Sequence, residues 1–148
     1  MVQTLGEELL RRSETKKEIE NIQSRIHANL WVRENGSPLE DPKELIKEAL
    51  RMSDTLFWQT KMINAVNNRT MLLTNMSLSE AIVEREMMIR NRNILNKVVD
   101  AAQKREQTEV KMVIAVSMEE IRSDINLLSM KIKALETEIQ KLNWKTEI

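Results

Sequence analysis

The clearest pattern along the chain is an uninterrupted series of apolar residues near its carboxyl end. Their spacing alternates between four and three residues, which is the heptad pattern of an amphipathic helix. From residue 125 onward Ile fills the a positions and Leu the d positions, a choice that favours two strands in an isolated parallel coiled coil. In a folded bundle the same face packs on helices of its own chain, so both arrangements remain open. The series comprises Ile121, Ile125, Leu128, Ile132, Leu135, Ile139 and Leu142, and Trp144 follows it as an interface or packing anchor.

A second helix is predicted from Asp41 to about Asn67. Asp41 can cap the first turn, Pro42 fits the first helical position, and Glu44 has the spacing of a capping box. One face of this helix is apolar and is interrupted only by Gln59. That face comprises Leu45, Ala49, Met52, Leu56, Ile63 and Val66.

Capping-box pairs also open two further predicted helices. Ser77 and Glu80 precede a helix that runs to about Arg105, and Ser117 and Glu120 precede the heptad helix. The helix that follows Ser77 carries two arginines on a stripe that is otherwise apolar. This stripe comprises Leu78, Ala81, Arg85, Met88, Arg92, Leu95, Val99 and Ala102.

The first predicted helix, from about Thr4 to Asn29, has the weakest apolar face. Its apolar residues fit a three-four spacing, but Arg12, Lys16 and Gln23 lie on the same stripe. We therefore expect one side of this helix to be buried only in part, or to meet the charges of a partner. The apolar members of the stripe are Val2, Leu5, Leu9, Ile19, Ile26 and Leu30.

Three segments between these helices lack the helical period. Residues 31–41 contain the run Asn-Gly-Ser-Pro, which is turn chemistry. Residues 68–76 fit a short extended loop or strand. Residues 110–116 are rich in β-branched side chains and fit a short strand, which could pair with residues 70–74.

These elements predict a mainly α fold: a bundle of about four long amphipathic helices that forms a single helical domain over residues 1–148. The pattern leaves open a short two-stranded β element. Composition agrees, because 41% hydrophobic residues supply a core, whereas two Gly and two Pro exclude a turn-rich sandwich or barrel.

Charge and composition narrow the class of partner. The chain has 23 basic and 23 acidic residues, interspersed, so it lacks the basic excess typical of a nucleic-acid binder. The first residues do not fit a signal peptide, and the longest apolar run, 112–116, is far shorter than a membrane span. We therefore expect a soluble protein, cytoplasmic if it is bacterial, with no nucleic-acid partner.

The sequence offers little catalytic or metal-binding chemistry. It has no Cys and one histidine, His27, and Ser24 stands where a Glu-x-x-His motif needs its Glu. We expect no metal, no cofactor and no catalytic residue, and we interpret His27 as a surface residue near a helix end.

One charged cluster is a candidate binding site. Arg85 and Arg92 lie two helical turns apart on an apolar face, with Glu84 and Glu86 beside Arg85. One interpretation is a site for an anion or carboxylate between helices or subunits. The other is ion pairing with a neighbouring helix, with the arginine stems packed on the core, and this is the interpretation we favour.

Several short segments carry a family resemblance. They are Glu40-Asp41-Pro42, residues 64–68, Leu78-Ser79-Glu80-Ala81 leading to Arg85-Glu86, Glu109-Val110-Lys111, Asp124, and residues 140–144. In this order, from about residue 5 onward, the chain resembles the septicolysin-like family of small bacterial helical proteins. This chain departs from the family pattern in two places. The family often has an Asp-Gly turn where this chain has Thr74-Asn75-Met76, and it prefers Arg-Asp where this chain has Arg85-Glu86. The resemblance implies an all-helical protein whose biochemical role is not established, and the family name implies a cytolysin.

The leading functional hypothesis is a non-enzymatic helical protein that forms homo-oligomers and acts through protein contacts. The unbroken Ile and Leu heptads and the mixed surface charges favour it. The alternatives are a membrane-active cytolysin, as the family name implies, and a small-ligand binder with an intersubunit Arg/Glu pocket.

Overall fold

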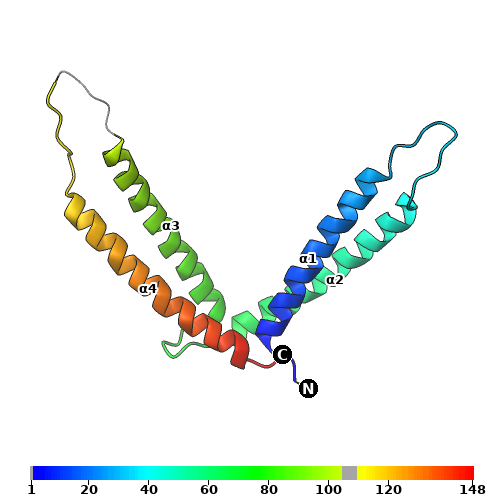
Figure 1. Ribbon diagram of the computed structural model, residues 1–148. Helices are drawn as coiled ribbons and strands as arrows, with labels where there is room; N and C mark the ends of the chain where they lie inside the picture. The colour runs from blue at the N-terminus through cyan, green and yellow to red at the C-terminus, as the bar shows by residue number, and fades with distance from the viewer. Residues whose placement is uncertain (1, 105–109) are drawn as a thin grey trace. The chain divides into compact units, whose positions relative to one another are not determined.

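The computed structural model describes residues 2–104 and 110–148, and within these ranges the chain forms four long helices and no strand (Figure 1). The prediction of a mainly helical fold is therefore confirmed. The predicted end of the third helix, Arg105, lies outside the described residues. The helices are α1 (Leu5–Ala28), α2 (Pro42–Arg69), α3 (Leu78–Gln103) and α4 (Met118–Lys145).

Two of the helices begin at a complete capping box. Ser77 and Glu80 open α3 as predicted, each side chain accepting a hydrogen bond from the other residue's backbone N–H. The same arrangement opens α1, where the Thr4 hydroxyl lies 3.2 Å from the Glu7 nitrogen. The sequence analysis placed the start of α1 near Thr4 but did not identify this box.

The other two helix starts use a single side-chain cap. The Ser117 hydroxyl accepts from Glu120 N at 3.3 Å at the start of α4. Asp41 caps α2 by accepting from Lys43 N at 3.0 Å, and Pro42 is the first helical residue. Glu44 does not complete the predicted box, because its carboxylate lies 3.2 Å from Lys47 Nζ on the next turn.

The described chain divides into two compact units. One contains the residues up to Thr70 together with Asn143–Ile148, and the other contains Met71–Leu142. Each unit is a pair of helices joined by a loop. The single helical domain expected over residues 1–148 stays a prediction.

Helices α1 and α2 pack as a hairpin along one heptad seam. On α2 the predicted face is confirmed: Leu45, Ile63 and Val66 are buried, and Gln59 is half-buried among them. The Gln59 Oε1 atom is buried without a hydrogen-bond partner in the described structure. The rest of this face, Ala49, Met52 and Leu56, is half-buried.

The predicted stripe of α1 is buried only in part. Leu5 is buried and Leu9, Arg12, Ile19 and Ile26 are half-buried, whereas both end residues of the stripe are exposed. Val2 and Leu30 are exposed at 58% and 52%, and Lys16 and Gln23 are exposed as well. At every second stripe position the buried residue is the one just before it, namely Glu8, Thr15, Ile22 or Asn29. Three of these four buried side chains are polar. The buried and half-buried seam consists of Leu5, Glu8, Arg12, Thr15, Ile19, Ile22, Ile26 and Asn29.

Hydrogen bonds explain why polar residues occupy these seam positions. Gln3 Nε2 donates to the Glu8 carboxylate, and Thr15 Oγ1 donates to the Arg11 carbonyl at 3.0 Å. Buried polar groups with partners avoid most of the cost of losing water. An apolar pattern alone therefore does not identify the polar members of the α1 seam.

The loop between α1 and α2 is closed by two polar contacts on Glu40. Arg25 donates two hydrogen bonds to the Glu40 carboxylate, and the Asn29 side chain accepts from Glu40 N at 3.1 Å. The hydrogen bond from Arg25 lowers the pKa of the Glu40 carboxyl. Asn29 also donates to the Arg25 carbonyl, which ends α1.

The two ends of the chain meet in the unit that contains α1. Leu5 N donates to Thr146 O at 2.9 Å, and Ile148 N donates to Gln3 O at 2.9 Å. These bonds form an isolated antiparallel bridge between Thr4 and Glu147. The carboxyl-terminal segment thereby satisfies backbone groups next to the first turn of α1.

Helices α3 and α4 form the other unit. The predicted stripes supply the buried residues of its helices, Leu78, Ala81 and Met88 on α3 and Ile132 and Ile139 on α4, and Leu72 of the preceding turn is buried as well. The two helices meet on a polar contact as well, because Arg92 Nη1 on α3 lies 3.4 Å from Ser129 Oγ on α4.

The predicted strands do not form among the described residues. Residues 110–116 are an exposed loop, and residue 71 forms an isolated bridge with Ser77 instead of pairing with that loop. The turn between them contains Asn75 at φ 61°, and Leu72 N donates to Met76 O at 2.8 Å. This local closure uses the backbone groups of residues 70–74 that a pairing with 110–116 would need.

Candidate interaction surface

A groove runs between α3 and α4 on one side of their hairpin. Its volume is about 390 Å³. Four of its lining residues are apolar: Ile94 and Leu95 from α3, and Leu127 and Leu128 from α4. Leu95 and Leu128 belong to the predicted stripes and are half-buried, whereas Ile94 and Leu127 are 55% and 50% exposed.

Charged and polar side chains border this groove. Asp124 and Lys131 of α4 and Asn91 of α3 complete its lining, and all three are exposed. Asp124 precedes Leu127 by three residues, and Lys131 follows it by four. These spacings place the two charges on the same side of α4 as Leu127, with opposite signs one turn to either side of it.

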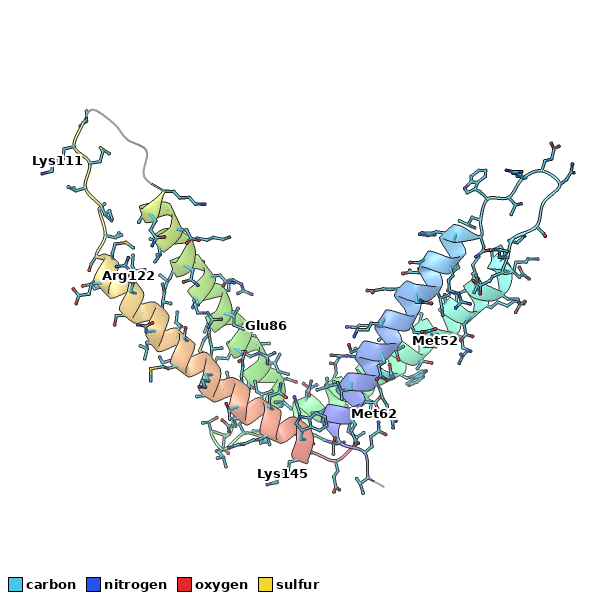
Figure 2. All side chains as sticks on the ribbon, viewed as in Figure 1. Met52, Met62, Glu86, Lys111, Arg122 and Lys145 are labelled. Carbon is cyan, nitrogen blue, oxygen red and sulfur yellow. The ribbon has the colours of Figure 1, made fainter. Side chains whose placement is uncertain are left out.

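A second exposed apolar face lies on α2. Phe57 and Trp58 are 58% and 61% exposed, and their rings meet edge to face with centroids 5.3 Å apart. Lys61, one turn further along, places its Nζ 5.0 Å from the centre of the Trp58 ring. Ile46, Leu50 and Met62 are also exposed on this helix, the last of them labelled in Figure 2.

The loops that join the two helices of each hairpin carry exposed apolar side chains. In the α1–α2 loop, Trp31 is 91% exposed and Leu39 is fully exposed. In the described part of the α3–α4 loop, Val113 is 80% exposed. The same loop carries Val110, Met112, Ile114 and Val116, each at least half exposed.

The four residues of the predicted Arg/Glu site are not gathered at this groove. Arg85 and Glu84 are half-buried on α3, Glu86 is exposed (Figure 2), and Arg92 contacts Ser129. None of the four lines the groove between α3 and α4. The contact from Arg92 is a hydrogen bond that joins the two helices of one hairpin, and both the ion-pairing interpretation and the binding site stay predictions.

The heptad face of α4 is used within the chain over part of its length. Ile132 and Ile139 are 3% and 2% exposed, while the remaining heptad residues are half-buried. Trp144 is 53% exposed and its ring lies against Gly6 of α1. Whether the half-buried members, Ile121, Ile125, Leu128, Leu135 and Leu142, also meet a second chain stays a prediction.

The comparisons with known proteins place the chain in a family. Residues 12–148 match the family of unknown function DUF6847. The chain belongs to this family. The match does not test the septicolysin-like resemblance, which stays a prediction. No curated protein matches this DUF6847 chain.

A solved structure shares the fold of this DUF6847 chain. It is the crystal structure of a functionally unknown conserved protein from Corynebacterium diphtheriae, with a TM-score of 0.93 and 24% sequence identity. The similarity covers 100% of this chain and 99% of that one. At this identity the similarity supports the helical fold alone.

Two further properties of the DUF6847 chain concern metals and membranes. Over residues 2–104 and 110–148, no group of three or more His, Asp or Glu side chains is arranged to hold a metal ion, and His27 is exposed. In the same ranges, every helix is too short or too polar to cross a bilayer.

The heptad pattern of the sequence does not predict the groove between α3 and α4. Ile94 and Leu127 lie one position before stripe residues, at Leu95 and Leu128, so the heptad pattern does not include them. A signal was nonetheless present, because Ile94-Leu95 and Leu127-Leu128 are adjacent apolar pairs. Such pairs widen an apolar stripe beyond the seam between two helices.

Proposed function

We propose that this DUF6847 chain is a non-enzymatic helical protein that acts through self-assembly and protein contacts. One observation carries the proposal: both hairpins expose apolar side chains on their helices outside the buried seams. On α2 these residues are Ile46, Leu50, Phe57, Trp58 and Met62, on α3 they are Val83, Met87 and Ile94, and on α4 they are Leu127 and Met130.

Exposed apolar side chains of this kind favour association with another protein surface. A pair of helices buries one stripe of each helix, so any second apolar stripe remains in water. Contiguous exposed apolar patches on soluble proteins mark interaction sites. Covering half-exposed Leu, Ile or Phe side chains contributes about 1 kcal/mol each. Several such side chains together offset part of the entropy lost on association.

The test is the mass of the full chain in solution. We expect sedimentation velocity and light scattering to give a mass that rises with concentration to at least twice the 17.3 kDa of one chain. Replacing Phe57 and Leu50 with Ser removes exposed apolar area on α2 and leaves its seam intact. A chain that stays monomeric at every concentration and captures no partner contradicts the proposal.

The exposed loop tips support a second candidate function, membrane activity. Trp31 and Leu39 present apolar side chains directly to solvent, and tryptophan favours the interface between a bilayer and water. The test is leakage of dye from sealed vesicles over a range of pH and lipid charge. Leakage that grows with protein and is lost in Trp31→Ser and Leu39→Ser supports membrane activity, and intact vesicles under every condition contradict it.

A further inference from the structure

We propose that the groove between α3 and α4 binds the same groove of a second copy, with the two α4 helices antiparallel and crossing at Leu127. This inference rests on the proposed function, since it names the partner and the surface of that self-assembly. The partner is a second copy of this chain because the charges that border the groove are complementary to themselves, with Asp124 and Lys131 on either side of the exposed Leu127.

The apolar part of the contact is centred on one exposed side chain. Leu127 lines the groove and is 50% exposed, although the half-buried Leu95 and Leu128 lie beside it. Ile94, which is 55% exposed, lines the opposite wall. When two copies meet face to face, each Leu127 is covered by the apolar lining of the partner's groove. The contact thereby removes from water the apolar atoms that the hairpin itself leaves exposed.

The charges determine the direction of the two helices. In an antiparallel pair with its two-fold axis at Leu127, a residue three positions before Leu127 lies opposite one about four positions after it. Asp124 therefore lies opposite the partner's Lys131, and symmetry repeats the pair. A parallel pair in the same register would place Asp124 opposite Asp124 and Lys131 opposite Lys131, which is repulsive.

The same two residues do not pair with each other within one chain. They are seven positions apart on a helix that rises about 1.5 Å per residue, so their backbones are separated by about 10 Å. The ion pairs among the described residues are Arg25–Glu40, Lys47–Glu44 and Arg51–Glu48, and they involve neither Asp124 nor Lys131. Asp124 and Lys131 are thus available to a partner.

Charge reversal provides the test. In the Asp124→Lys variant both bordering positions are positive, and in the Lys131→Glu variant both are negative. Each variant alone repels its own copy, and we expect its dissociation constant for self-association to rise about tenfold or more at low salt. An equimolar mixture of the two variants places opposite charges across the groove at both sites. We therefore expect the mixture, and the double variant Asp124→Lys/Lys131→Glu, to associate as the wild type does.

Matched controls change the same charges on the other side of α4. Lys133→Glu and Glu136→Lys alter exposed residues that do not line the groove, and we expect both to associate like the wild type. Circular dichroism confirms that each variant keeps its helix content. Sedimentation velocity of each chain alone and of the mixture measures the association.

The outcomes separate this inference from the proposed function. A wild type that associates while both single reversals associate equally well overturns the groove as the interface and leaves self-assembly standing. A mixture that fails to associate when the single variants also fail overturns the antiparallel arrangement. A wild type that is monomeric at all concentrations overturns both the groove and self-assembly.

Discussion

The indole ring of Trp144 lies directly over Gly6, so that a β-carbon at residue 6 would be 2.8 Å from Cδ2 of the ring. Gly6 is buried in the first turn of α1, and Trp144 is at the end of α4. Glycine is thus used here because only a residue without a side chain allows the ring to approach the helix so closely.

We expect Gly6→Ala to destabilise the protein although alanine is the better helix former. The alanine methyl gains about 1 kcal/mol of helix propensity. Overpacking against the ring costs about 1–3 kcal/mol, so the net loss in the free energy of unfolding should be about 1 kcal/mol. Urea denaturation of the wild type and the variant measures the difference.

A double-mutant cycle separates the two effects. A Trp144→Ala background removes the ring that the methyl group would overlap, and Gly6→Ala should then stabilise the protein by about 1 kcal/mol. If Gly6→Ala has the same effect in both backgrounds, the ring and the glycine are not in contact.

The heptad face of α4 should be essential for stability where it is buried. Ile139 is 2% exposed, so Ile139→Ala leaves a cavity and should lower the free energy of unfolding by about 3 kcal/mol. Met130→Ala on the same helix, at 70% exposure, should change it by less than about 0.5 kcal/mol. Equal effects of the two substitutions in urea denaturation would show that the face of α4 is wrongly assigned.

The turn before α3 depends on the backbone conformation of Asn75. Its φ of 61° lies in the left-handed region, where a β-carbon costs about 1 kcal/mol or more unless the side chain is Asn or Asp. Asn75→Ala should lose about that amount in thermal or urea unfolding, whereas Asn75→Gly should stay within about 0.5 kcal/mol of the wild type. Asn93→Ala, at an exposed position inside α3, is the matched control and should not destabilise. A loss from Asn75→Gly as large as that from Asn75→Ala would contradict the assignment.

The contact between Arg25 and Glu40 should make stability depend on pH. The hydrogen bond from Arg25 lowers the pKa of Glu40 in the folded state, so the folded chain holds this proton less tightly than the unfolded chain. The stabilisation is therefore present above the unfolded pKa of about 4.3 and is lost as pH falls through the folded pKa. Glu40→Gln should lower the melting temperature at pH 7, and its difference from the wild type should shrink toward pH 3.

Two comparisons check this pH dependence. Glu34→Gln changes an exposed carboxylate in the same loop and should show a smaller difference at pH 7. Added salt should reduce the effect of Glu40→Gln, since both side chains of the pair are about 40% exposed, at 42% and 40%. A pH-independent difference between Glu40→Gln and the wild type would rule out the ionic contribution.

Local sequence signals identified most of the helices correctly. The caps at Asp41, Ser77 and Ser117 are short-range interactions between a side chain and a backbone N–H two or three residues away. Such signals depend on few neighbours, so they can be read without a tertiary structure. The apolar face of α2 was also predicted correctly, because its period is long and regular and depends only on the spacing of residues along the helix.

The errors occurred where burial depends on a partner. On α1 the predicted stripe includes Leu30 and omits Glu8 and Asn29, whereas the structure exposes Leu30 and buries the two polar residues. Both polar residues are compensated by partners, Gln3 in one case and Glu40 in the other. The β-branched segment 110–116 similarly matched a strand by composition but is a loop. A strand needs a second strand beside it, and composition alone does not supply one.

Short-range sequence patterns therefore predict that the chain is helical, where its helices begin, and which residues form the longest apolar stripes. Folding in three dimensions buries Glu8, Thr15 and Asn29, places Trp144 over Gly6, and leaves Leu127 exposed beside Asp124 and Lys131. The two kinds of feature differ in how far apart along the sequence the interacting residues lie. Helix caps and periodicity involve neighbours along the chain, whereas burial of a polar group or exposure of an apolar one depends on residues that folding brings together.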